Sequence, residues 1–177
     1  AEAEARAAGR LRRRAVYLAV ALVTAAGLLL APIVFFWPLW VPVPGVQQTI
    51  VAGDFLDEYF PQRVFVSREL WHGRLPLWNP HIFAGQPGLY DPQSAALYPG
   101  AWLTALLGGP GGPPWWLVEL EAMAHLGLAG LFMFLLVRRL LKADGPALVS
   151  AVAYMFGGYL TSWPLNQLSV LESSIWL

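Results

Sequence analysis

The chain has 177 residues, of which 57% are hydrophobic and only 12% are charged. Soluble domains carry about 25% charged residues, so this composition excludes an ordinary soluble domain and indicates a membrane protein. The formal net charge is zero, which predicts no nucleic-acid partner, and the chain has no cysteine, which excludes disulfides and thiolate metal sites.

Three apolar segments predict transmembrane helices, at 15–37, 115–137 and 146–163. The first holds no charged residue, and a bilayer core requires about 20 apolar residues in helical form. A signal peptide is the alternative for this segment, but the run exceeds a signal peptide's apolar region and no small-residue cleavage site follows it. Residues 164–177 are expected to form an external turn and the start of a fourth span, so we expect the chain to be the N-terminal part of a larger protein.

Basic residues cluster on one side of these spans. They are Arg10, Arg12, Arg13 and Arg14 in the N-terminal segment 1–14, and Arg138, Arg139 and Lys142 in the loop 138–145. Because cytoplasmic loops are enriched in Lys and Arg, both segments are expected in the cytoplasm, with the long loop 38–114 outside it.

Within this loop, residues 59–72 have a helical rhythm. Phe60, Val64 and Trp71 fall on one stripe, whereas Arg63 and Glu69 lie off it. The pattern predicts an amphipathic helix that lies on the outer membrane surface. A helix packed on its own loop is the alternative. The following residues, 74–100, are rich in proline and glycine turns that would hold polar side chains in fixed positions.

The sequence "GDFLDEYF" places three carboxylates, Asp54, Asp57 and Glu58, shortly after the first span. A carboxylate on the outer surface can accept a proton from a hydroxyl nucleophile or help to hold a divalent cation such as Mg²⁺ or Mn²⁺. The alternative is a helix N-cap with first-turn acids, which suits Asp57 and Glu58 better than Asp54.

His125 lies inside the second predicted span, where an ionisable residue is a functional candidate. It can equally be a neutral histidine that bonds to a neighbouring helix. Glu119 and Glu121 are expected near the interface. The three histidines have no metal-binding spacing, and the chain has no nucleotide-binding or nucleophile-elbow motif.

An ordered series of motifs over residues 15–177 resembles bacterial YfhO-type membrane proteins. The motifs are Gly53-Asp54, then Gly73 with Pro76, Trp78, Asn79 and Pro80, then Phe83 with Gly85 and Pro87, then Pro92-Gln93, and Tyr98-Pro99. The resemblance implies an all-α integral membrane protein, a multi-pass transmembrane helix bundle of GT-C glycosyltransferase type with a large first extracytoplasmic loop that contains short surface helices.

Such enzymes of the bacterial cytoplasmic membrane transfer a sugar from a polyprenyl-phosphate donor to a cell-envelope acceptor, which can be a glycopolymer, a lipid or a protein. Some family members are linked to the decoration of lipoteichoic acid. By the resemblance Asp54 is the catalytic base, with Asp57 or Glu58 as a second acid. A transporter or flippase of lipid-linked substrates and a non-catalytic scaffold are the alternative functions.

For sugar transfer, the loop offers a set of candidate substrate-binding residues. Guanidinium groups pair well with phosphate oxygens, so an arginine is expected to neutralise the carrier phosphate, and aromatic rings are expected to stack on sugars. The candidates are Arg63, Arg68, Arg74, Trp78, Asn79, Gln93 and Tyr98.

Overall fold

The computed structural model describes residues 2–41, 43–46, 48–50 and 53–176, and the described chain is mostly helical. The elements in chain order are α1 (Glu2–Phe35), the 3₁₀ turn η1 (Trp37–Trp40), the π-helical turn η2 (Phe55–Tyr59), α2 (Phe60–Trp71), β1 (Trp78–Asn79), β2 (Gln86–Pro87), the 3₁₀ turn η3 (Pro92–Ser94), α3 (Pro99–Gly108), α4 (Trp115–Leu141), α5 (Asp144–Met155), α6 (Trp163–Asn166) and α7 (Leu168–Ser174).

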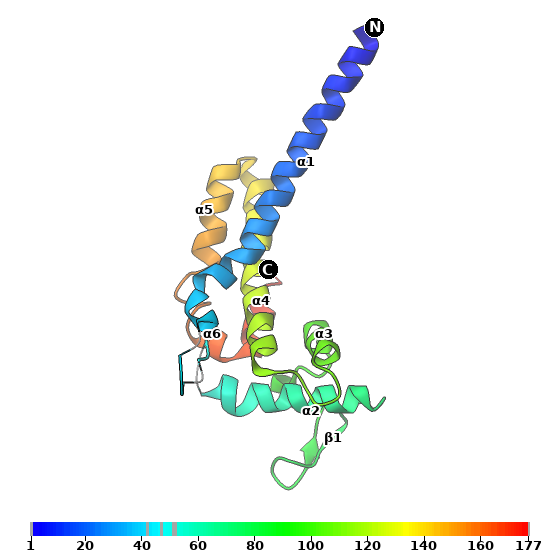
Figure 1. Cartoon of the computed structure of the whole chain (residues 1–177), viewed down its shortest axis with the longest axis vertical. Coiled ribbons are helices and arrows are strands. Elements are labelled where there is room, and N and C mark those ends of the chain that lie inside the picture. The colour runs from blue at the N-terminus through cyan, green and yellow to red at the C-terminus, as the bar shows by residue number, and fades with distance from the viewer. Residues whose placement is uncertain (1, 42, 47, 51–52, 177) are drawn as a thin grey trace.

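Two helices of the described chain are long and apolar enough to cross a membrane, over Leu11–Phe35 in α1 and Trp115–Leu141 in α4. They coincide with the first two predicted spans. Half of the apolar window of α4 is buried inside the molecule, but only 11% of the α1 window is. Figure 1 shows α1 packed beside α4 near its own C-terminal end and extending past the α4–α5 pair toward the N-terminus.

The third predicted span, 146–163, is wrong in its extent, because α5 ends at Met155. Its 12 residues rise about 18 Å, which is short of the ~30 Å hydrocarbon core. Gly157 and Gly158 follow, and glycine is a poor helix former. The chain turns there and continues into the short helices α6 and α7.

Small residues allow the long helices to approach closely. A Cβ atom on Gly127 of α4 would lie 2.9 Å from the carbonyl oxygen of Leu29 in α1, and one on Gly130 would lie 2.6 Å from the sulfur of Met155 in α5. Ala147 and Ala151 of α5 are fully buried in the same cluster as Met155. Close contacts at small residues are typical of helix packing in membranes.

Helix α2 lies across the end of α4 where α4 begins, and the β1–β2 hairpin projects from the opposite side of α2 (Figure 1). The helix ends where Gly73 adopts a φ of +69°. The amide of Gly73 bonds to the carbonyl of Leu70, and the amide of Arg74 bonds to the carbonyl of Glu69, each at 2.9 Å. This is a Schellman cap, for which glycine is favoured because it tolerates a positive φ.

A helix is present at α2 as predicted, but Arg63, which lies off its predicted apolar stripe, is one of its buried residues. Arg63 is 1% exposed and Trp71 is 47% exposed. The helix is buried against the rest of its own loop, since the Ser67 hydroxyl donates to the carbonyl of Ala105 at 2.9 Å and the Trp71 indole donates to the same carbonyl at 3.0 Å. The structure therefore matches the alternative of a helix packed on its own loop.

Candidate functional site

A cavity of about 940 Å³ lies between η2, the outward side of α2 and the segment that carries the hairpin and η3; we call it the α2 groove. Its lining residues are Asp54, Asp57, Glu58, Phe60, Pro61, Gln62, Val64, Phe65, Arg68, Glu69, Asn79, His81, Ile82, Phe83, Gln86, Tyr90, Asp91, Pro92 and Gln93. Six of the sequence-predicted site residues share this lining: Asp54, Asp57, Glu58, Arg68, Asn79 and Gln93.

Asp54 and Glu58 lie about one helical turn apart in the lining of the groove. Burial, together with the charges of Asp91 and Asp54, raises the pKa of Glu58 above its usual 4.5. The Gln93 side chain lies against Glu58, and its amide nitrogen donates to the carboxylate in the orientation that satisfies both groups. Burial and the neighbouring carboxylates thus favour the protonated form of Glu58.

Asp54 is fixed by a residue from the far end of the chain. Gln167 donates from Nε2 to Oδ2 of Asp54 at 3.0 Å. Asp54 occupies the N-cap of η2, yet its side chain makes no capping hydrogen bond with the described backbone. The N-cap alternative thus leaves the Asp54 carboxylate unexplained, whereas Asp57 is exposed at the rim of the groove.

The two walls of the groove are joined through Asp91. Gln62 of α2 donates from Nε2 to Oδ2 of Asp91 at 3.1 Å, and the backbone N–H of Gln93 donates to Oδ1 of Asp91 at 2.8 Å. Asn79 is 4% exposed and its side-chain oxygen accepts from the amide of His81 at 3.0 Å. Asn79 and Asp91 therefore hold turns of the wall in place, which is a common use of these residues.

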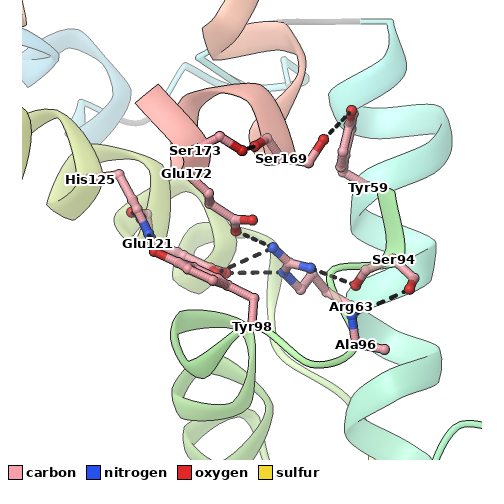
Figure 2. A network of polar contacts seen from close by, with 10 residues as sticks. All are labelled: Tyr59, Arg63, Ser94, Ala96, Tyr98, Glu121, His125, Ser169, Glu172 and Ser173. Atoms are coloured by element: carbon pink, nitrogen blue, oxygen red, sulfur yellow. Dashed lines mark hydrogen bonds and ion pairs between the residues drawn. The ribbon is translucent and has the colours of Figure 1, made fainter. Parts of the chain in front are cut away.

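Arg63 lies outside the groove, in a buried polar network. Figure 2 shows its guanidinium between Glu121 of α4 and Glu172 of α7. Nε donates to Glu121 Oε2 at 3.3 Å, Nη2 donates to both carboxylates, and Nη1 donates to the carbonyl of Ser94 at 2.8 Å. Although burial alone would lower the pKa of Arg63, the two carboxylates raise it. Because Arg63 is buried and already paired with two carboxylates, it cannot neutralise a carrier phosphate, so that predicted role is wrong.

The other two predicted phosphate-binding arginines differ from one another. Arg74 is exposed and pairs with Glu69 through two hydrogen bonds of 2.8 Å, which lower the pKa of the Glu69 carboxyl. Arg68 lines the groove while its Nε donates to the carbonyl of Gly111 at 3.2 Å. Only Arg68 of the three lies in the groove lining.

The two predicted sugar-stacking rings also lie apart from the groove. The Trp78 ring covers the backbone of Gly85, where a Cβ atom would lie 2.7 Å from the ring and φ is +110°. The Tyr98 hydroxyl and Nε2 of His125 are 2.7 Å apart and hydrogen-bonded (Figure 2). His125 thus matches the alternative of a histidine bonded to a neighbouring element, and Tyr98 is its partner rather than a groove ring.

The sequence analysis did not identify several residues that take part in buried polar contacts or line the α2 groove. Glu172 was not singled out, although a lone acid in an apolar segment is a signal for a buried pairing. Glu119, expected near the interface, is 3% exposed and accepts from the amide of Ile50 at 2.9 Å. The groove rings Phe83 and Tyr90, 88% and 82% exposed, were not assigned to sugar contacts either.

Among the described residues, no three histidine or acidic side chains are grouped so that they could hold a metal ion. The divalent cation considered from the sequence has no ligand group of this size in the described chain. Among known proteins, no family model, no curated protein and no solved structure matches this chain.

Proposed function

We propose that this chain provides the acceptor-activating site of a membrane glycosyltransferase that uses a polyprenyl-phosphate sugar donor. The observation that carries the proposal is the α2 groove, where Asp54 and Glu58 lie together on one wall of a cavity of about 940 Å³. This volume lies in the usual range for small-molecule sites, about 300–1,000 Å³. The groove has room for the acceptor sugar whose hydroxyl attacks the donor.

In this proposal the Asp54–Glu58 pair acts as the general base. The acceptor hydroxyl transfers its proton to the pair as its oxygen forms a bond to the anomeric carbon of the donor sugar. The bond from that carbon to the carrier phosphate breaks, and the phosphate leaves with the electron pair. The anomeric configuration inverts. The raised pKa of Glu58 supports this role, because a base works best when its pKa is close to the operating pH.

The proposed setting is a multi-pass bundle of GT-C type in a bacterial cytoplasmic membrane. The basic ends of α1 and α4 would face the cytoplasm, in line with the positive-inside rule. Helix α2 lies across the opposite end of α4, which would put the α2 groove on the extracytoplasmic side (Figure 1). A lipid-linked donor would then reach the groove from the outer leaflet.

Purified full-length protein in liposomes with a radiolabelled polyprenyl-phosphate sugar and a mixture of envelope glycans tests this function. Covalent transfer of the label to a glycan supports the proposal. Movement of the labelled lipid between leaflets without transfer indicates the flippase alternative, and neither result indicates a scaffold. Both of these outcomes contradict sugar transfer.

A further inference from the structure

The charge of the α2 groove restricts what it can accept. Asp54, Asp57, Glu58 and Asp91 line it, and Arg68 is the one arginine among the described lining residues. Glu69 also lines the groove, but its charge is matched by Arg74. An anion that enters this space meets more carboxylates than cations, and like charges brought together at a binding surface cost several kcal/mol.

The cation closest in sequence to these acids is unable to compensate them. Arg63 follows Glu58 by five positions, yet its guanidinium is turned into the buried network and already faces two carboxylates (Figure 2). The nearest arginine therefore leaves the carboxylates of the groove without a compensating cation.

The rest of the lining suits an uncharged, hydroxyl-rich ligand. Phe83 and Tyr90 are 88% and 82% exposed and line the cavity, so their ring faces are open to a ligand. Phe83 and Ala84 hold φ values of +51° and +59°, which are uncommon for residues other than glycine and mark a strained loop tip. Carboxylates accept hydrogen bonds from hydroxyl groups, and most small-molecule sites combine such polar groups with an apolar wall.

We propose, on the basis of the function proposed above, that the α2 groove receives an uncharged sugar or polyol segment of the acceptor and excludes polyanionic chains and the carrier phosphate. The acceptor is then a neutral glycan, unlike the phosphate-rich lipoteichoic acid decorated by some proteins that the sequence resembles. The phosphate of the donor then stays outside the groove. The carboxylates that activate the acceptor hydroxyl thus also select an acceptor without negative charge.

Saturation-transfer NMR on the full-length protein in phosphatidylcholine nanodiscs tests this selectivity. The probes are maltotriose and maltotriose phosphorylated at its terminal sugar, two ligands of the same length that differ in charge. We expect maltotriose to bind at least tenfold more tightly at low ionic strength, and the difference to shrink when salt is raised, because salt screens the carboxylates.

Two exposed positions provide variants that spare Asp54 and Glu58. Asp57→Lys reverses one rim charge, and we expect it to improve binding of the phosphorylated probe about threefold or more relative to maltotriose. Tyr90→Ala should weaken maltotriose binding, which places the ligand in the groove. The reverse preference, equal binding of both probes, or no binding of either would overturn the proposal.

Failure of the charge selection can be distinguished from failure of the proposed sugar transfer. If the phosphorylated probe binds as well as maltotriose while the protein still transfers sugar from the labelled carrier, the charge selection fails and the function stands. If maltotriose is preferred but no sugar is transferred, the proposed function fails instead.

Discussion

Arg63 of α2 and Glu121 of α4 meet in the buried interior with Nε of the arginine 3.3 Å from Oε2 of the glutamate, although 58 positions separate them in the chain. Their side chains are 1% and 3% exposed. With Glu172 of α7, the pair joins the loop that carries the α2 groove to the long apolar helix and to the far end of the chain. The position of the groove on the helices depends on this network.

Replacement of Arg63 by methionine should therefore destabilise the protein strongly. The substitution leaves two buried carboxylates without their partner, which typically costs about 3–5 kcal/mol. The measurement is thermal unfolding in detergent, followed by circular dichroism. The matched control is Arg74→Met, which breaks an exposed, solvent-screened ion pair and should leave the melting temperature nearly unchanged. Equal losses in the two variants would contradict a role for the buried network.

The pH dependence of stability should report on Glu58. Its pKa in the folded protein is raised above 4.5, so between these two values the folded state binds more protons than the unfolded state. The free energy of unfolding should fall as pH rises through this window. Glu58→Gln removes the titrating group, so the variant should lose this slope and become more stable than wild type above the raised pKa. Thermal unfolding of both proteins from pH 4 to pH 8 measures the difference.

Asp91→Asn provides a second check on the same effect, because the Asp91 charge is one of the causes of the raised pKa. This variant keeps an oxygen that can accept from Gln62 or Gln93 and should show a shallower slope than wild type. A wild-type slope in Glu58→Gln would assign the pH dependence to other groups.

The contact between α1 and α4 predicts opposite effects for two glycine substitutions. Gly127→Ala places a methyl group 2.9 Å from the Leu29 carbonyl, and such overpacking typically costs about 1–3 kcal/mol. Gly27→Ala on α1 meets no described atom within 4 Å, so the better helix propensity of alanine should stabilise the protein by up to about 1 kcal/mol. Melting temperatures in the same detergent compare them. Destabilisation by both substitutions, or by neither, would argue against this packing.

The helices could be predicted from the sequence because the patterns that specify them are local. The uncharged run before Phe36 predicts the apolar part of α1, and the turn residues between Gly73 and Tyr98 predict a segment of fixed turns. The wrong end predicted for the third span also has a local cause. The apolar character of the sequence continues past Met155, whereas the backbone turns at Gly157.

The orientation of α2 and the partners of Arg63 depend on contacts across the whole chain. The predicted apolar stripe of α2 left Arg63 on the polar side of the helix, but the carboxylates that bind Arg63 lie 58 and 109 positions away. The pairing of Asp54 with Gln167 is likewise a contact across 113 positions. Periodicity within a helix carries no information on such partners, so the sequence could suggest the groove acids but not which arginine lies beside them.

The most direct test of the account is the rate of sugar transfer by Asp54→Asn, with Asp57→Asn as the matched control at the rim of the same groove. The assay follows label from the polyprenyl-phosphate sugar to a neutral glycan, and thermal unfolding confirms that both variants are folded. Loss of a general base typically reduces turnover by about 10²–10⁴-fold, so we expect a reduction of at least the lower figure for Asp54→Asn and a rate close to wild type for Asp57→Asn. Transfer by Asp54→Asn at the wild-type rate would contradict the account.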